Sequence, residues 1–246
     1  MLPLRDENPT HSTPVLTLGL IVANLGVFAL QLSVGLSVSA FAWGLIPAEL
    51  VHHADRLYGS RLTGVAISNL DPAWLTVVTS MFMHGSFLHI LSNMWFLWIF
   101  GNNVEDHLGR ARFLLFYLLC GAGAAAAQVL AGPASAIPMV GASGALAGVM
   151  GAYLVLFPRS RILCLTTIFI ITTVELPAVL VLGFWFLLQV FNSLVQMGPR
   201  TPGGGVAYAA HVGGFVVGWV LIRLFTRPHP HRAHGHTRRP DSTDWR

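Results

Sequence analysis

Three apolar stretches, each roughly as long as the 20 residues that a helix needs to cross a ~30 Å hydrocarbon core, constrain this fold more than any other feature. They carry at most one charged side chain each and cover residues 15–34, 112–131 and 176–195. Of the 246 residues, 54% are hydrophobic and 10% are charged, which is too apolar for an ordinary soluble domain. The sequence therefore predicts an integral protein of the lipid bilayer.

Three further apolar stretches are shorter and contain Gly, Ser, His or Asn, which favours helices that face protein or water more than lipid. They cover residues 84–101, 143–157 and 208–222. All six stretches together predict an all-α polytopic membrane protein with six transmembrane helices. We expect a flexible cytoplasmic leader, a six-helix membrane domain and a disordered, basic, His-rich cytoplasmic tail, over residues 1–14, 15–226 and 227–246.

Arginine is distributed unevenly between the expected loops. It is frequent after the second and fourth helices and in the tail, whereas the opposite loops are poorer, apart from Arg56 and Arg61. The positive-inside rule then places both termini in the cytoplasm, and we expect a bacterial plasma (inner) membrane. The formal charge of +4 and the pI of about 9.7 come largely from the tail. They indicate contact with anionic lipid headgroups and not with nucleic acid.

Polar side chains gather at one depth of the expected bundle. The second, fourth and sixth helices run inward from the outer side, so their N-terminal ends lie at similar depth. The polar residues at those ends are His84, His89, Asn93, Ser143 and His211. Ionisable groups in a membrane helix are costly and mark functional sites by default. This shared depth therefore predicts a site several ångströms below the outer surface.

Small residues on the fourth and sixth helices predict that the two helices pack closely. Gly144, Gly148 and Gly151 form a stripe on the fourth helix, and Gly214 and Gly218 form a GxxxG pattern on the sixth. Such stripes let helix backbones approach each other in lipid. Since Ser143 precedes the first stripe and His211 precedes the second, we expect their side chains to meet.

A serine hydroxyl becomes a useful nucleophile when a histidine within hydrogen-bond reach takes its proton. Ser143 and His211 are candidates for such a pair. No carboxylate lies near these helix ends, which favours a dyad over a triad.

Attack on an amide also needs donors for the negative charge that develops on the carbonyl oxygen. The backbone N–H of Ser143, at a helix start, and the side chains of Asn93 and His89 are candidates. Gly141 and Gly144, on either side of Ser143, permit a tight turn and a close approach of substrate.

These residues resemble the motifs of the rhomboid intramembrane proteases. The segment from His84 to Asn93 resembles the HxxxxHxxxN of the family's second helix, Gly141-Ala-Ser143-Gly144 its GxSG motif, and the segment from Ala210 to Gly218 its AHxxGxxxG motif. Order and spacing agree across residues 79–220.

The resemblance implies the rhomboid fold, with Ser143 as nucleophile and His211 as base. It implies that Asn93, His89 and the Ser143 backbone bind the oxyanion, and that His84 supports them near a water-filled entrance. It further implies that the substrates are transmembrane proteins cleaved near their outer ends, and that no cofactor is needed.

Two positions depart from the family pattern. Many members carry a Trp-Arg pair in the first outer loop, where this chain has Trp74-Leu75. Some members have an aromatic residue four positions after the nucleophile, which stacks on the histidine, where this chain has Ala147. Other groups must then orient the imidazole. Trp185 and Phe186, on the fifth helix, are candidates for a lateral gate or for simple packing.

Three other functions are compatible with parts of this pattern. A catalytically inactive rhomboid-like protein would bind membrane clients, although it would not need both Ser143 and His211. A small transporter would show repeated halves, which the sequence lacks. A zinc protease using His84, His89 and His211 would carry an HExxH motif, and none is present, so we expect no metal. No pattern in the sequence indicates an oligomeric state.

Overall fold

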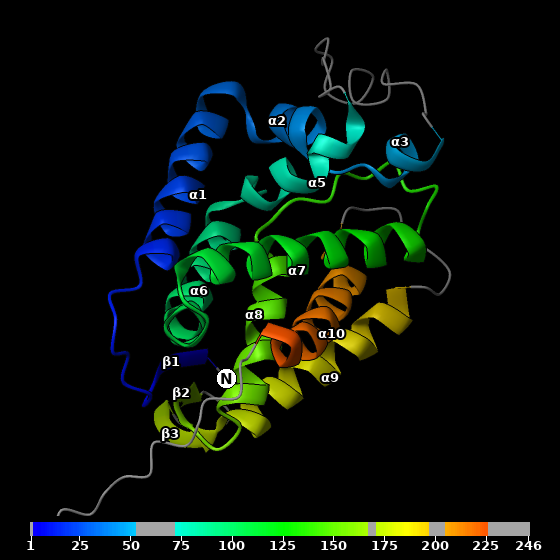
Figure 1. Cartoon of the computed structure of the whole chain (residues 1–246). Helices are drawn as coiled ribbons and strands as arrows, with labels where there is room; N and C mark the ends of the chain where they lie inside the picture. Colours follow the sequence, from blue (N-terminus) through cyan, green and yellow to red (C-terminus); the bar gives the residue numbers. More distant parts are fainter. Residues whose placement is uncertain (1, 53–71, 167–170, 197–204, 226–246) are drawn as a thin grey trace, which may run out of the picture.

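The computed structural model of the chain describes residues 2–52, 72–166, 171–196 and 205–225. Most of the described residues are helical (Figure 1). The helices are α1 Val15–Val34, α2 Leu36–Trp43, α3 Pro47–His52, η1 Ala73–Leu75, α5 Thr76–Thr79, η2 Ser80–Phe82, α6 Phe87–Leu108, α7 Arg110–Ala131, α8 Ser143–Leu156, α9 Ala178–Gln196 and α10 Tyr208–Phe225. The expected tail over residues 227–246, together with Arg56 and Arg61, lies outside the described residues.

Within the described residues, four helices are long and apolar enough to span a membrane, namely α1, α7, α9 and α10. The helical segment Ala73–Phe82 and α6 meet at a bend of 80° and count as a fifth span if the pair is taken as one. The helix α8 is also apolar but has only 14 residues. The prediction of a mainly helical integral membrane protein is therefore confirmed, with four to five spans by length and composition.

The helix α8 lies at the centre of the bundle, between α6, α7 and α10 (Figure 1). Every residue from 145 to 153 is buried, because small side chains let the neighbouring helices approach on all sides. At 1.5 Å per residue, 14 residues give a helix about 21 Å long. This length is shorter than a ~30 Å hydrocarbon core, and the buried residues of α8 face protein.

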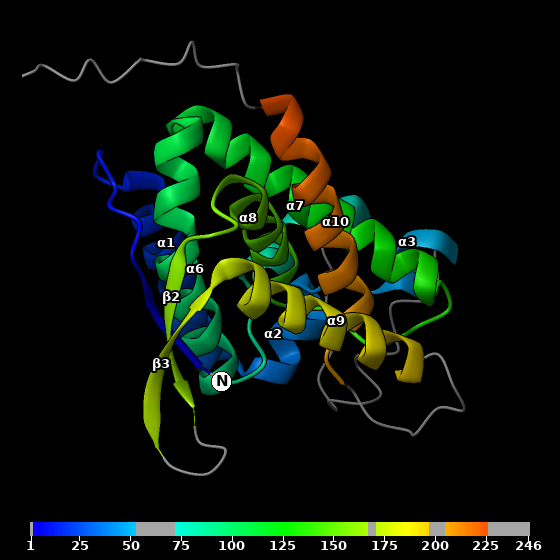
Figure 2. The ribbon, with the colours of Figure 1, turned by 90° about the horizontal axis from the view of Figure 1, so that it is seen from below.

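A three-stranded antiparallel sheet corrects the all-α prediction. The strands are β1 Leu2–Asp6, β2 Arg161–Thr166 and β3 Thr172–Pro177, in the order β1-β2-β3. In β2 the side chains of Ile162 and Cys164 are buried and their neighbours are more exposed, which is the period of two expected for a strand. The sheet lies beyond the end of α8 and before the start of α9 (Figure 2). Its Ile, Val and Thr residues favour strands. The strands are short and lie next to long apolar segments in the sequence, so their pattern is difficult to recognise.

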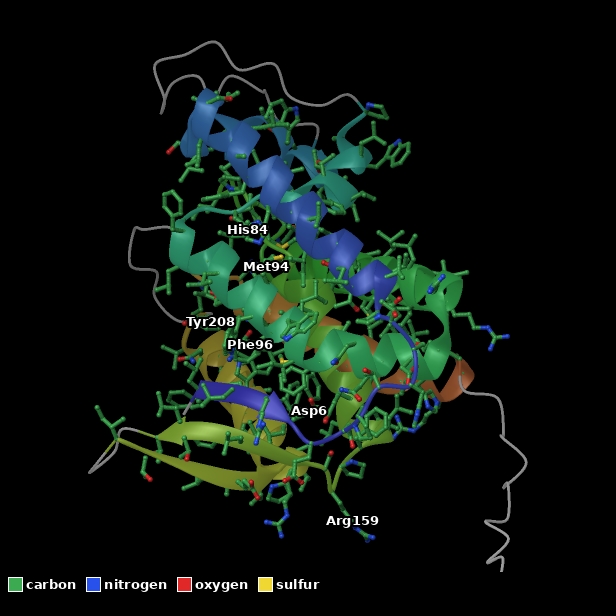
Figure 3. All side chains as sticks on the ribbon, turned by 90° about the vertical axis from the view of Figure 1, so that its left-hand side faces the viewer. Asp6, His84, Met94, Phe96, Arg159 and Tyr208 are labelled. Atoms are coloured by element: carbon green, nitrogen blue, oxygen red, sulfur yellow. The ribbon has the colours of Figure 1, made fainter. Side chains whose placement is uncertain are left out.

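Residues 2–6 form the strand β1, in the segment that the sequence predicted to be a flexible leader. The carbonyl oxygen of Pro3 accepts a 2.7 Å hydrogen bond from the Trp95 indole. The Asp6 carboxylate accepts 2.7 Å hydrogen bonds from the hydroxyl of Tyr153 and the amide of Asn103. These contacts tie β1 to α6 and α8, and Figure 3 shows Asp6 at the end of β1 and His84 toward the other end of α6.

The environment of Asp6 predicts a pH-dependent stability. Burial raises the pKa of this carboxyl above its ordinary value of 3.8, although the hydrogen bond from Tyr153 opposes the shift. The folded protein thus holds this proton more tightly than the unfolded chain does. The contribution of the protonated Asp6 to the free energy of unfolding is therefore full below pH 3.8, and it is lost as the pH rises through the pKa of Asp6 in the folded protein. We expect the melting temperature of Asp6→Asn in detergent to fall less than that of the wild type as the pH rises over this range. Equal pH slopes for the two proteins would contradict this assignment.

Candidate active site

The segment that precedes α8 is held in one conformation, and it places Ser143 at the first position of that helix. Gly141 has a φ of 126°, which favours glycine because a side chain would be strained there. Its N–H donates to the carbonyl of Ser80 at 2.9 Å. Upstream, Leu45 and Met139 exchange backbone hydrogen bonds of 3.0 and 2.7 Å. The turn is therefore fixed from two sides, and the Ser143 side chain is half-buried.

The side chain of His211 lies against that of Ser143. His211 is in the first turn of α10, is 9% exposed, and has its Nε2 2.8 Å from the Ser143 Oγ. The N–H of the preceding residue, Ala210, donates to the Gln128 side chain of α7 at 3.2 Å. The geometry expected from close packing of the fourth and sixth helices is thus present, although the residues are 68 positions apart in the chain.

Glycines on both helices account for this proximity. A Cβ added to Gly214 would overlap the carbonyl oxygen of Gly144, and one added to Gly218 would overlap the carbonyl oxygen of Gly148. A Cβ on Gly151 would overlap the carbonyl oxygen of Phe215. The backbones of α8 and α10 therefore touch, at spacings that only glycine allows.

Two residues of α9 contact the other side of the His211 ring. The Oε1 of Gln189 lies 2.9 Å from the His211 Nδ1. The ring of Trp185, one helical turn earlier, lies 5.8 Å from the imidazole centroid at an interplanar angle of 34°. Ala147 on α8 is small and fully buried, and the Tyr208 ring of α10 lies edge-on to the imidazole with centroids 6.3 Å apart.

His89 and Asn93 lie on α6, and the helix start beside them is capped. The side-chain oxygen of Ser86 accepts from the His89 N–H at 3.2 Å and begins the helix. A Cβ on Gly141 would lie 2.7 Å from the His89 Nε2 and 3.4 Å from the Ser143 Oγ. The imidazole of His89 is therefore close to the serine across Gly141.

Asn93 is one turn further along α6 and is buried. Its amide nitrogen has no hydrogen-bond partner among the described residues. An orphaned buried donor is costly, so this nitrogen is available to a ligand or to water. It fits a group that binds negative charge.

His84 is also completely buried, in the segment between η2 and α6. Its backbone N–H donates to the Gln31 side chain of α1 at 2.8 Å, and its ring lies 5.1 Å from that of His89. Neither ring nitrogen has a partner among the described residues. The structure thus places His84 behind His89 and not against the serine.

The remaining positions singled out in the sequence lie around this centre. Trp74, in η1, is 60% exposed. Phe186 stacks on Phe215 with centroids 4.5 Å apart, so it joins α9 to α10. Sequence reasoning missed Gln189, although one polar residue within a charge-free membrane helix is itself a signal of an interhelical contact.

Comparison with known proteins gives a consistent result. Residues 71–228 match the family model described as the rhomboid domain. The chain is 34% identical over 186 residues to "Rhomboid-like protein 11, chloroplastic" of Arabidopsis thaliana, which covers 72% of this chain and 62% of that protein. It is 31% identical over 148 residues to "Rhomboid protein 1, mitochondrial" of Saccharomyces cerevisiae, which covers 58% of this chain and 40% of that protein.

A third similar protein is "Rhomboid protease GluP" of Bacillus subtilis, 32% identical over 140 residues that cover 57% of this chain and 26% of that protein. The chain thus spans less than two thirds of the length of each of these three relatives. The first is named as chloroplastic and the second as mitochondrial, and the third comes from a bacterium. The comparisons therefore do not support the predicted location in a bacterial inner membrane over a location in another membrane.

Proposed function

This chain belongs to the rhomboid family, and from that premise we propose that it is an intramembrane serine endopeptidase. The observation that carries the proposal is the 2.8 Å contact between the Ser143 Oγ and the His211 Nε2. This contact lies at the start of a buried helix, where a base and a nucleophile share one site. A protein that only binds membrane clients gains nothing from this geometry.

In the proposed reaction the His211 Nε2 takes the proton of Ser143 while the Oγ attacks a peptide carbonyl carbon. The tetrahedral intermediate carries its negative charge on the former carbonyl oxygen. In this proposal the backbone N–H of Ser143, the Asn93 amide and the His89 imidazole donate to that oxygen. His211 then gives its proton to the leaving amine as the C–N bond breaks, which leaves an acyl-enzyme. In the second half His211 takes a proton from water, the water oxygen attacks the ester carbonyl carbon, and the bond to the Ser143 Oγ breaks as His211 returns the proton to that oxygen.

The substrates in this proposal are transmembrane proteins, cleaved near the outer membrane face. We count α8 as a sixth, short span beside the four long helices and the bent pair, and we place both termini on the cytoplasmic side. The arginine distribution supports this orientation. The sheet would then lie at the cytoplasmic face and Ser143 toward the outer one, since they are at opposite ends of α8.

The test is cleavage of a single-span model substrate co-reconstituted in liposomes, read by the masses of the products. We expect Ser143→Ala and His211→Ala each to abolish cleavage. Ser33→Ala is the matched control, because Ser33 is exposed on α1 and its hydroxyl donates to the Leu30 carbonyl of the same helix. Cleavage that survives Ser143→Ala would exclude this mechanism. A wild type that cleaves none of a varied set of substrates would favour the inactive, client-binding alternative.

A further inference from the structure

The side chain of Gln189 completes a chain of contacts that runs from α9 through α10 to α8. Its Oε1 lies 2.9 Å from the His211 Nδ1, and the His211 Nε2 lies 2.8 Å from the Ser143 Oγ. Gln189 is only 8% exposed, in a helix whose described residues from 178 to 195 are otherwise almost entirely apolar. A buried amide at this position forms a specific contact, because an unpaired one would be costly.

The orientation of the Gln189 amide determines which imidazole nitrogen carries the proton. Its Nε2 donates to the Trp185 carbonyl oxygen at 3.3 Å, so its Oε1 faces His211. An amide oxygen only accepts hydrogen bonds, so the His211 Nδ1 must be the protonated nitrogen. The Nε2 is then unprotonated and faces the serine, which is the tautomer that a general base requires.

Trp185 holds the ring from a second direction. The indole lies 5.8 Å from the imidazole at 34°, and Trp185 and Gln189 are one turn apart on the same face of α9. On α8, Ala147 is small and fully buried, and among the described residues the aromatic rings beside the imidazole are those of Trp185 on α9 and Tyr208 on α10. The contact to the His211 Nδ1 thus comes from α9.

We propose that Gln189 is a positioning residue, which holds the His211 imidazole in the tautomer and direction that activate Ser143. This inference rests on the proposed peptidase function. In a Ser-His-Asp triad the third residue is a carboxylate, which also stabilises the imidazolium. Gln189 is neutral, so it fixes the tautomer without adding a negative charge to the membrane interior, where a charge would be expensive.

The test compares Gln189→Leu and Gln189→Glu with the wild type across a pH series. Gln189→Leu keeps much of the side-chain volume but removes the acceptor, and we expect kcat to fall by roughly 100-fold with KM unchanged. Gln189→Glu keeps the acceptor and adds a charge that favours the imidazolium. We expect it to restore most of the activity above neutral pH and to move the acid limb of the pH–rate profile to higher pH.

The labelling rate of Ser143 by a small fluorophosphonate gives a second readout that does not depend on the binding of a protein substrate. It should fall in Gln189→Leu in parallel with kcat. Gln196→Leu is the matched control, since Gln196 is exposed on the same helix and donates to the Val206 carbonyl. It should match the wild type in both assays.

Three results would overturn the inference. The first is a Gln189→Leu enzyme with unchanged kcat and pH profile. The second is a rise in KM alone, which would assign Gln189 to substrate binding. The third is an equal loss in Gln189→Leu and Gln189→Glu at every pH, which indicates a packing role. If the wild type neither cleaves substrate nor reacts with the fluorophosphonate, the proposed function itself fails.

Discussion

Replacing Gly214 with alanine is expected to reduce cleavage by about 100-fold or more, because a misplacement of about 1 Å at a reacting pair can cost that much. The new Cβ would overlap the Gly144 carbonyl oxygen. This oxygen belongs to the backbone of α8 and cannot rotate away, so the two helices must separate. The Ser143 Oγ and the His211 Nε2, now 2.8 Å apart, would lose their hydrogen bond. The measurement is the initial cleavage rate in liposomes.

Gly26→Ala is the control for this substitution. Gly26 is also in a membrane helix, α1, but a Cβ there would meet nothing within 4 Å. Since alanine favours helix more than glycine does, activity should be unchanged and stability unchanged or slightly higher. Full activity in Gly214→Ala would show that the contact between α8 and α10 does not set the distance between the serine and the histidine.

Glu105→Ala is expected to cause the largest loss of stability, roughly 3 to 5 kcal/mol. The Glu105 carboxylate is 2% exposed. It accepts from the N–H groups of Leu16 and Thr17 and from the Thr17 hydroxyl, at 2.9, 2.7 and 2.8 Å. It thereby caps the start of α1, where the helix dipole favours negative charge. Without it, three donors remain without an acceptor between α1 and α6.

The neighbouring residue provides a matched comparison in the same chemical class. Asp106 accepts from the backbone N–H groups of His11 and Ser12 at 2.9 Å, but these contacts are exposed. Water can replace them, so Asp106→Ala should cost about 1 kcal/mol or less. Denaturant unfolding of both variants in detergent micelles measures the difference. Similar losses for the two would contradict the importance of burial at Glu105.

The membrane helices could be predicted from the sequence because the hydrocarbon core dictates their length and composition. The predicted stretch 15–34 coincides with α1, and the predicted start at residue 143 coincides with the start of α8. The contact between Ser143 and His211 could also be expected, because glycine stripes on two helices limit the packing to one face of each. The sheet could not be predicted, since β1 and β2 pair across more than 150 residues and neither is long enough to produce a strong pattern.

Three glutamines show what one-dimensional reasoning overlooks within a membrane. Gln31 on α1 accepts from the His84 backbone, Gln128 on α7 accepts from the Ala210 backbone, and Gln189 on α9 contacts the His211 ring. Each comes from a helix that reads as a plain apolar span. Which face of a span meets the site depends on the rotation of the helix, and apolar composition does not encode that rotation. An amide side chain in such a helix nevertheless marks a residue to examine first.

The pairing of β1 with β2 has a consequence for the order of events during synthesis. Asp6 pairs with Ile162, so β1 has no partner until the ribosome has added some 155 more residues, which takes roughly 8 to 30 seconds at 5–20 residues per second. Among the described residues, six α-helices are synthesised in that interval (α1, α2, α3, α5, α6 and α7), and α8 follows immediately before β2. The sheet thus closes only after the serine-bearing helix exists. Protection of the β1 amides from hydrogen exchange would therefore report when the helices around α8 have been assembled.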